Sequence, residues 1–102
     1  MRKQKQFWTV VSERTFQRLR ELSEETGMTI TKVVLWILFE QFDYSTEIRN
    51  DYTFTTAKGH KIVAKVTDEE LERLQDLAQK HSMSVSRLVR NILYTHFFKK
   101  SE

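Results

Sequence analysis

The chain has 102 residues, no cysteine, a formal net charge of +3 and a pI near 9.3, so it forms one or two small domains without disulfides or thiolate-bound metal. No stretch approaches the roughly 20 apolar residues of a membrane span, and no apolar run follows the basic first residues as in a signal peptide. We therefore expect a cytoplasmic protein without a membrane partner.

The first predicted element is a strand over residues 6–11, QFWTVV. β-branched and aromatic residues dominate it, as is typical of strands. Alternation gives this strand an inward and an outward face. The outward residues are Gln6, Trp8 and Val10. The basic residues before the strand form an expected loose arm, in which Arg2, Lys3 and Lys5 are the candidate contacts to a polyanion.

Two helices follow. Ser12 is the expected N-cap of the first helix, and Gly27 is well placed to end it in a left-handed conformation. Thr29 is the expected N-cap of the second helix. The apolar stripe predicted for the second helix is Ile30, Val33, Val34, Ile37 and Leu38.

Residues 62–97 repeat residues 7–42 without a gap, and nine of the 36 aligned positions are identical. The second copy therefore has a strand over 61–66 and two helices of its own. Thr67 and Glu70 have the spacing of a capping box, and Ser84 caps the last helix. The outward residues of this second strand are Lys61, Val63 and Lys65.

Neither copy alone satisfies the backbone of its strand or buries a sufficient core. We expect the two strands to pair as an antiparallel ribbon covered by four helices, which gives an α+β fold. The whole chain, 1–102, is then a single pseudo-dimeric domain. Its parts are unit 1 (about 6–42), a tether (43–59) and unit 2 (about 60–98).

The order strand, helix, helix, with second helices that start Thr29-Ile30-Thr31 and Ser84-Val85-Ser86, resembles the ribbon-helix-helix (Arc/MetJ-like) DNA-binding superfamily. The resemblance implies a tandem-copy member whose ribbon enters the major groove, where the six outward strand residues read bases. It also implies that the two helix starts each hold a backbone phosphate. The implied phosphate-binding residues are Thr29, Ile30, Thr31, Lys32, Ser84, Val85, Ser86 and Arg87.

The outward side chains differ in what they can recognise. Gln6 can pair with adenine, and Lys61 or Lys65 with guanine, whereas the apolar side chains suit thymine methyls. Two hypotheses follow: an asymmetric, T-containing site, or one half that reads poorly while affinity depends on phosphates. The alternatives without DNA are that the lysines form a solvated strand face and that Trp8 packs under residues 1–5.

The first copy is more apolar than the second at three positions of its second helix. Leu35, Trp36 and Phe39 stand where the second copy has polar residues or a tyrosine. A helix that is apolar on most sides has to be covered. Either the tether covers this face with Tyr44, Tyr52 or Phe54, or the face joins two molecules on adjacent DNA sites.

The sequence offers little for catalysis. It has no nucleophile–base arrangement, glycine-rich phosphate loop or paired-carboxylate signature, and His60, His81 and His96 lack metal-ligand spacing. We expect no enzyme activity, no catalytic residues, no metal, no cofactor and no small-molecule substrate.

These patterns predict a sequence-specific double-stranded DNA-binding protein that acts as a viral or plasmid transcription regulator or repressor. One alternative is a relaxosome accessory or architectural DNA-binding protein of a mobile element. A third is an antitoxin-like protein-interaction module. Antitoxins usually append a disordered partner-binding tail, whereas only residues 99–102 follow the last predicted helix here.

Overall fold

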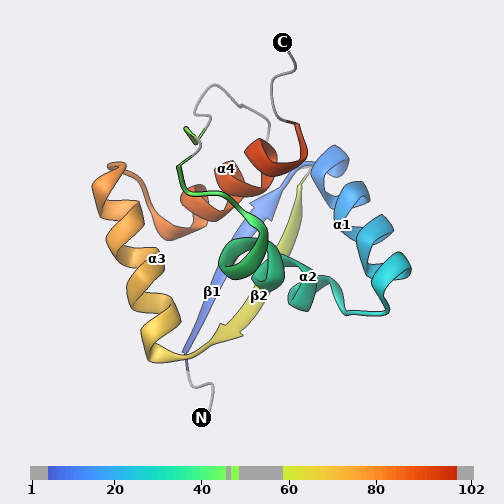
Figure 1. Cartoon of the computed structure of the whole chain (residues 1–102), viewed down its shortest axis with the longest axis horizontal. Coiled ribbons are helices and arrows are strands. Elements are labelled where there is room, and N and C mark those ends of the chain that lie inside the picture. Colours follow the sequence, from blue (N-terminus) through green and yellow to red (C-terminus); the bar gives the residue numbers. More distant parts are fainter. Residues whose placement is uncertain (1–4, 46, 49–58, 99–102) are drawn as a thin grey trace.

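The computed structural model describes residues 5–45, 47–48 and 59–98 (Figure 1). Within these residues the fold is α+β, with a two-stranded antiparallel sheet and four helices, the second of which ends in a π-helical turn, η1. The elements are β1 (Lys5–Val11), α1 (Glu13–Thr26), α2 (Ile30–Trp36), η1 (Ile37–Gln41), β2 (His60–Val66), α3 (Asp68–Lys80) and α4 (Val85–Phe97). None of the described helices is long and apolar enough to cross a membrane.

The two strands pair along their full length. Lys5 lies opposite Val66 and Val11 lies opposite His60, so each strand begins one residue earlier than the sequence predicted. The assignment of Lys5 to a loose arm was therefore wrong, because pairing with the far end of β2 holds its backbone in the ribbon. The other predicted arm residues, Arg2 and Lys3, lie outside the described residues.

The inward face of the ribbon forms the floor of the core. Phe7, Val11, Ile62, Ala64 and Val66 are all at most 5% exposed. Figure 1 shows α1 and α3 on the two sides of the ribbon, with α2 and α4 crossing it. The second helices contact the strand of the other repeat, because α4 packs on β1 and α2 on β2. Because each second helix packs on the strand of the other repeat, the two repeats share one continuous core.

The predicted apolar stripe of the second helices is buried at most positions. In α2 and η1, Val33, Val34, Ile37 and Leu38 have no exposed surface, and their counterparts Leu88, Val89, Ile92 and Leu93 in α4 have none either. The first residue of each stripe is half-buried instead, because it lies at the exposed start of its helix. Burial of an aliphatic side chain stabilises a fold by about 1.5–3 kcal/mol, so these residues are a main source of stability.

The predicted caps form at the starts of α1 and α3 and at the end of α1. Ser12 accepts a hydrogen bond from the Thr15 amide, and the reciprocal capping box of Thr67 and Glu70 is complete. Gly27 ends α1 with φ +78°, and Ser82, the equivalent residue of the second repeat, also has a positive φ, +58°. Both repeats thus turn through the same left-handed conformation, although only the first uses glycine for it.

The chain after α2 folds back onto the helix it has just left. The Phe42 amide donates to the Ile37 carbonyl at 2.8 Å, which closes the wide last turn. The Tyr44 hydroxyl then donates to the Leu38 carbonyl at 2.6 Å, and its ring stands edge-on to Phe42. Burial raises the pKa of Tyr44 to about 12. Tyr44 therefore acts as a neutral cap for the end of η1.

The additional apolar face of the first repeat is half-buried. Leu35, Trp36 and Phe39 pack against the hydrophobic core, and the guanidinium carbon of Arg73 lies 5.4 Å from the Phe39 ring centroid. Tyr44 caps the helix end, as described above. Tyr52 and Phe54, the other two residues expected to cover the face, lie outside the described residues.

Candidate nucleic-acid interface

The six predicted base-reading residues lie together on the outward face of the ribbon. Trp8 is 52% and Val63 43% exposed, whereas Val10 is half-buried. Gln6, Lys61 and Lys65 are exposed as well. Alternation along the two strands therefore predicted which side chains leave the core.

The register of the ribbon gives this face a defined pattern. Gln6 lies opposite Lys65, Trp8 opposite Val63, and Val10 opposite Lys61. One lysine therefore stands at each end, with an apolar pair at the centre. The Lys61 ammonium lies 5.4 Å from the Trp8 ring centroid, within the range of a cation–π interaction.

The predicted phosphate-binding residues lie at the starts of α2 and α4. The Thr29 side chain accepts from the Lys32 amide and the Ser84 side chain accepts from the Arg87 amide, each at 3.2 Å. Each cap satisfies one of the first amides, and the remaining first-turn amides have no partner within their own helix. Positive charge is added by Lys32 and Arg87, which are both exposed. Backbone N–H groups, helix dipole and cation favour an anion at such a site.

Hydrogen bonds attach both helix starts to the ribbon. The Thr9 hydroxyl donates to the Ser86 carbonyl at 2.6 Å, and the Thr31 hydroxyl donates to the Val63 carbonyl at 3.4 Å. Thr9 is fully buried on the inward face, where the second repeat has Ala64. Sequence reasoning missed this positioning role. A polar residue at an inward strand position was the signal that could have revealed it.

A groove of about 800 Å³ runs between β1 and the start of α4. All three outward residues of β1 line it, together with residues 84–87 at the start of α4. Gln75 and Arg90 also line the groove, and neither was among the predicted site residues. Arg90 could have been recognised from the sequence as a candidate site residue, because the second repeat has this arginine where the first repeat has Leu35.

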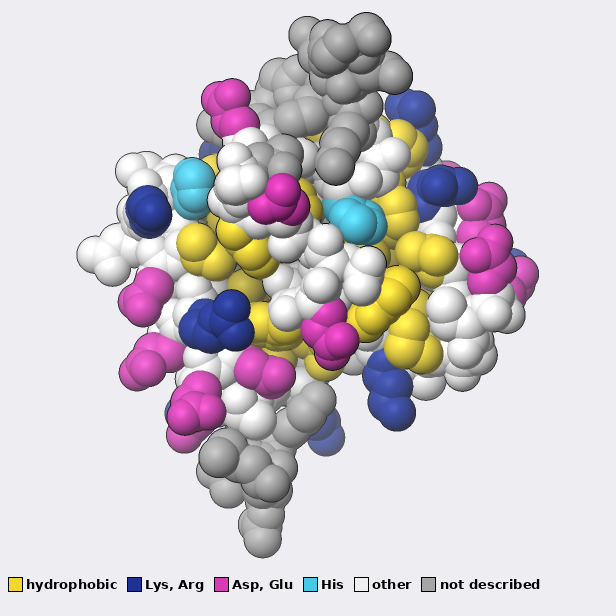
Figure 2. Space-filling view, in the orientation of Figure 1, with side chains coloured by type: hydrophobic (Ala, Val, Ile, Leu, Met, Phe, Trp, Pro, Cys, Tyr) yellow, Lys and Arg dark blue, Asp and Glu magenta, His cyan; other side chains and the backbone are white. Residues whose placement is uncertain are grey.

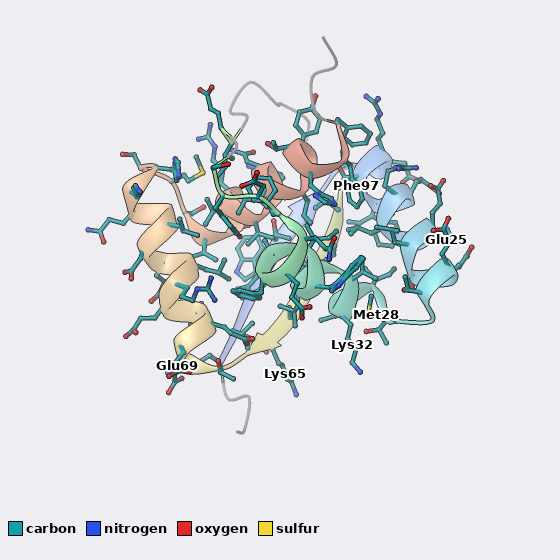
Figure 3. The ribbon with its side chains drawn as sticks, viewed as in Figure 1. Glu25, Met28, Lys32, Lys65, Glu69 and Phe97 are labelled. Atoms are coloured by element: carbon teal, nitrogen blue, oxygen red, sulfur yellow. The ribbon has the colours of Figure 1, made fainter. Side chains whose placement is uncertain are left out.

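The charges of the described residues are unevenly distributed. Figure 2 shows acidic side chains gathered over α3 and α1, on the two sides of the molecule. In Figure 3, Lys32 and Lys65 extend from the same edge, one from the start of α2 and the other from β2. A cation at a helix start and a cation on the ribbon thus point in a common direction, which suits an extended polyanion.

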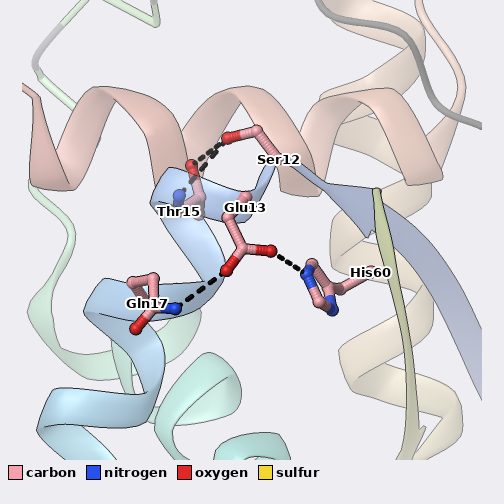
Figure 4. A network of polar contacts seen from close by, with 5 residues as sticks. All are labelled: Ser12, Glu13, Thr15, Gln17 and His60. Carbon is pink, nitrogen blue, oxygen red and sulfur yellow. Dashed lines mark hydrogen bonds and ion pairs between the residues drawn. The ribbon is translucent and has the colours of Figure 1, made fainter. Parts of the chain in front are cut away.

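Among the described residues, no three potential metal ligands gather in one place. His60 instead joins the start of β2 to α1 (Figure 4). Its Nε2 lies 2.5 Å from the Glu13 carboxylate, which also accepts from Gln17 at 2.8 Å. The His60 hydrogen bond is the main cause of the lowered pKa of Glu13. The imidazole also stacks on Phe16 with 4.1 Å between ring centroids, so the contact is structural.

No protein-family model, curated protein or solved structure has a significant match to this chain. The ligand of this interface is therefore inferred from the chemistry of its own residues.

Proposed function

We propose that the chain is a sequence-specific double-stranded DNA-binding protein of the ribbon-helix-helix type that regulates transcription, most simply as a repressor that occupies a promoter. In this proposal the two repeats form an intramolecular pseudo-dimer. Phosphate contacts at the starts of α2 and α4 fix the register, and the ribbon reads base edges in the major groove. The major groove is about 12 Å wide and admits a two-stranded ribbon.

Three features of the fold support the pseudo-dimer. Trp8 and Val63 are equivalent in the two repeats and pair directly, so the strands are related by a two-fold operation about this pair. Each second helix packs on the strand of the other repeat. Arg18 and Arg73, also equivalent, each lie over an aromatic ring near the end of the opposite second helix.

The observation that carries the DNA proposal is the shared groove beside β1. The base-reading side chains of β1 and the phosphate-binding start of α4 line the same hollow. Thr9 holds the two parts together through its hydrogen bond to Ser86. A sugar–phosphate strand in this groove would bring its phosphates to α4 while its bases face the ribbon.

Selection of binding sites from random duplexes with the full-length chain tests the proposal. We expect enrichment of one asymmetric motif, because the two strands present different side chains. Enrichment should be lost in a Gln6→Ala, Lys61→Ala, Lys65→Ala variant that still unfolds cooperatively. Binding without any enriched motif would contradict sequence-specific regulation. Strong bending of the bound duplex would instead favour the architectural or relaxosome role, since the same interface would serve it.

A further inference from the structure

The outward face of the ribbon is apolar at its centre and cationic at both ends. Resting on the DNA-binding function proposed above, we infer that the central pair, Trp8 and Val63, recognises the 5-methyl groups of thymines at the middle of the DNA site. The flanking lysines then face base pairs on either side. The central pair is thus a specificity-determining element, and it selects a methyl-bearing pyrimidine step.

The central pair exposes an unusual amount of apolar surface. Trp8, Val63 and Tyr44 are the exposed large hydrophobic residues among those described, and two of the three are paired neighbours. Contiguous apolar surface on a small protein commonly marks a binding site. The two side chains stand directly opposite each other, where Cβ atoms are about 4.5–5.5 Å apart, so they present one continuous apolar area.

The charges around this pair favour DNA over an apolar protein surface as its partner. Lys61 and Lys65 lie two residues along β2 from Val63, one on either side of the centre, and Lys61 lies close to the Trp8 ring. Arg87 and Arg90 line the adjoining groove. A partner that covers the patch must therefore be anionic around an apolar centre. In the major groove the thymine methyl is the apolar group between two lines of phosphates.

The spacing of the face agrees with the spacing of base pairs. Two residues along a strand span about 6.6 Å, and successive base pairs are about 3.4 Å apart. The end pairs of the ribbon therefore lie about two base steps from the centre. Lys65 beside Gln6 would meet guanine or adenine at one end, and Lys61 beside Val10 would meet guanine at the other.

Deoxyuridine substitution provides a direct test, since it removes only the methyl group. In the duplex selected by the full-length chain, each central thymine is replaced in turn by deoxyuridine. We expect affinity to fall about fourfold for each contacted methyl, from the transfer free energy of one methylene-sized group. Deoxyuridine outside the segment that the ribbon faces should leave affinity unchanged, which provides the control.

A protein variant completes the experiment. Val63→Thr keeps the shape of the side chain but replaces a methyl with a hydroxyl, so it should reduce the preference for thymine over deoxyuridine.

Unchanged affinity for every central deoxyuridine duplex would overturn the methyl inference and leave DNA binding in place. Failure to select any motif would remove the proposed function together with the inference. Self-association of the chain without DNA that is abolished by Val63→Glu would assign the patch to a second copy, and would also overturn the inference.

Discussion

Trp8 pairs directly with Val63 across the ribbon, although the two residues occupy the same position in two sequence repeats 55 residues apart. In a homodimer of single repeats, the residue on the two-fold axis would pair with its own copy. The two repeats of this chain differ in sequence, so the two residues of the central pair differ as well. The chain can therefore place a large aromatic ring beside a small aliphatic side chain at the centre, and the proposed DNA site need not be a palindrome.

The exposure of Trp8 makes intrinsic fluorescence a reporter of the outward face. In a Trp36→Phe protein Trp8 is the single tryptophan, so excitation that is selective for tryptophan reports this residue, which is 52% exposed. We expect its emission to shift to shorter wavelength or to be quenched when the selected duplex is added. The matched Trp8→Phe protein reports only Trp36, which is half-buried against the core, and should change little. A Trp8 spectrum that stays constant at saturating DNA would show that this residue is not at the interface.

The two lysines of the ribbon should dominate recognition by β2. Replacement of both Lys61 and Lys65 by alanine is expected to weaken binding to the selected duplex by at least about tenfold, because one good base contact contributes about 1–3 kcal/mol of discrimination. The slope of log affinity against log salt should also become shallower. Mobility-shift titrations at several salt concentrations measure both quantities.

A matched control removes two positive charges elsewhere. Arg14 and Arg18 lie over the Phe98 and Phe97 rings, at the end of α4 that is remote from Ser84. The 13-residue helix is about 20 Å long, at a rise of about 1.5 Å per residue. Their double alanine variant should retain the specific affinity. Equal losses in the two variants would mean that net charge, rather than the ribbon, determines binding.

Several features could be predicted from the sequence because they depend on local periodicity or on short-range hydrogen bonds. Alternation of period two assigned the buried and exposed strand residues, and the Ser or Thr caps at 12, 29, 67 and 84 all formed. Each copy of the 55-residue repeat forms a strand followed by two helices, as the sequence predicted. Each of these signals is contained within a few neighbouring residues.

Other features depend on contacts between distant segments and could not be predicted. The bond from Thr9 to Ser86 joins residues 77 positions apart. The groove beside β1 brings Gln75 and Arg90 from two different helices to the predicted interface. Strand pairing, which no local pattern specifies in detail, also extended β1 to include Lys5. Burial and tertiary register, rather than propensity, decide all three.

The two left-handed turns give a matched pair of stability predictions. Gly27 has φ +78°, and a Cβ atom added there would meet no other atom within 4 Å. Backbone strain is therefore the only expected cost of Gly27→Ser. Ser82 carries that strain already, at φ +58°. We expect Ser82→Gly to raise the free energy of unfolding by about 0.5–1 kcal/mol. Gly27→Ser should lower it by a similar amount. Urea unfolding measures both, and a destabilised Ser82→Gly protein would show that the serine side chain itself stabilises the turn.

The half-buried apolar face of the first repeat gives a prediction about assembly. Because Leu35, Trp36 and Phe39 pack against the core, Trp36→Glu should lower the free energy of unfolding by about 2 kcal/mol, since it removes apolar contacts and places a charge on a half-buried apolar surface. The mass in sedimentation should remain that of the unmodified chain. If the variant instead loses mass or cooperative DNA binding while remaining stable, the face joins two molecules on adjacent sites.

The contact between His60 and Glu13 predicts a defined pH dependence of stability. A carboxylate only accepts, so Nε2 of His60 carries the hydrogen that it donates to Glu13. This bond, and then that from Gln17, hold the pKa of Glu13 below its ordinary value of 4.5. A depressed carboxyl pKa stabilises the fold above the unfolded-state value, and this contribution is lost as pH falls through the folded-state value.

Glu13→Gln should therefore lower the midpoint of thermal unfolding at pH 7, and the difference from the unmodified chain should shrink as pH falls below about 4.5. His60→Phe keeps a ring over Phe16 but removes the donor. In that background Glu13→Gln should have a smaller effect, because its main partner is absent. A difference that is constant from pH 7 to pH 3 would show that the carboxylate charge does not contribute through this contact.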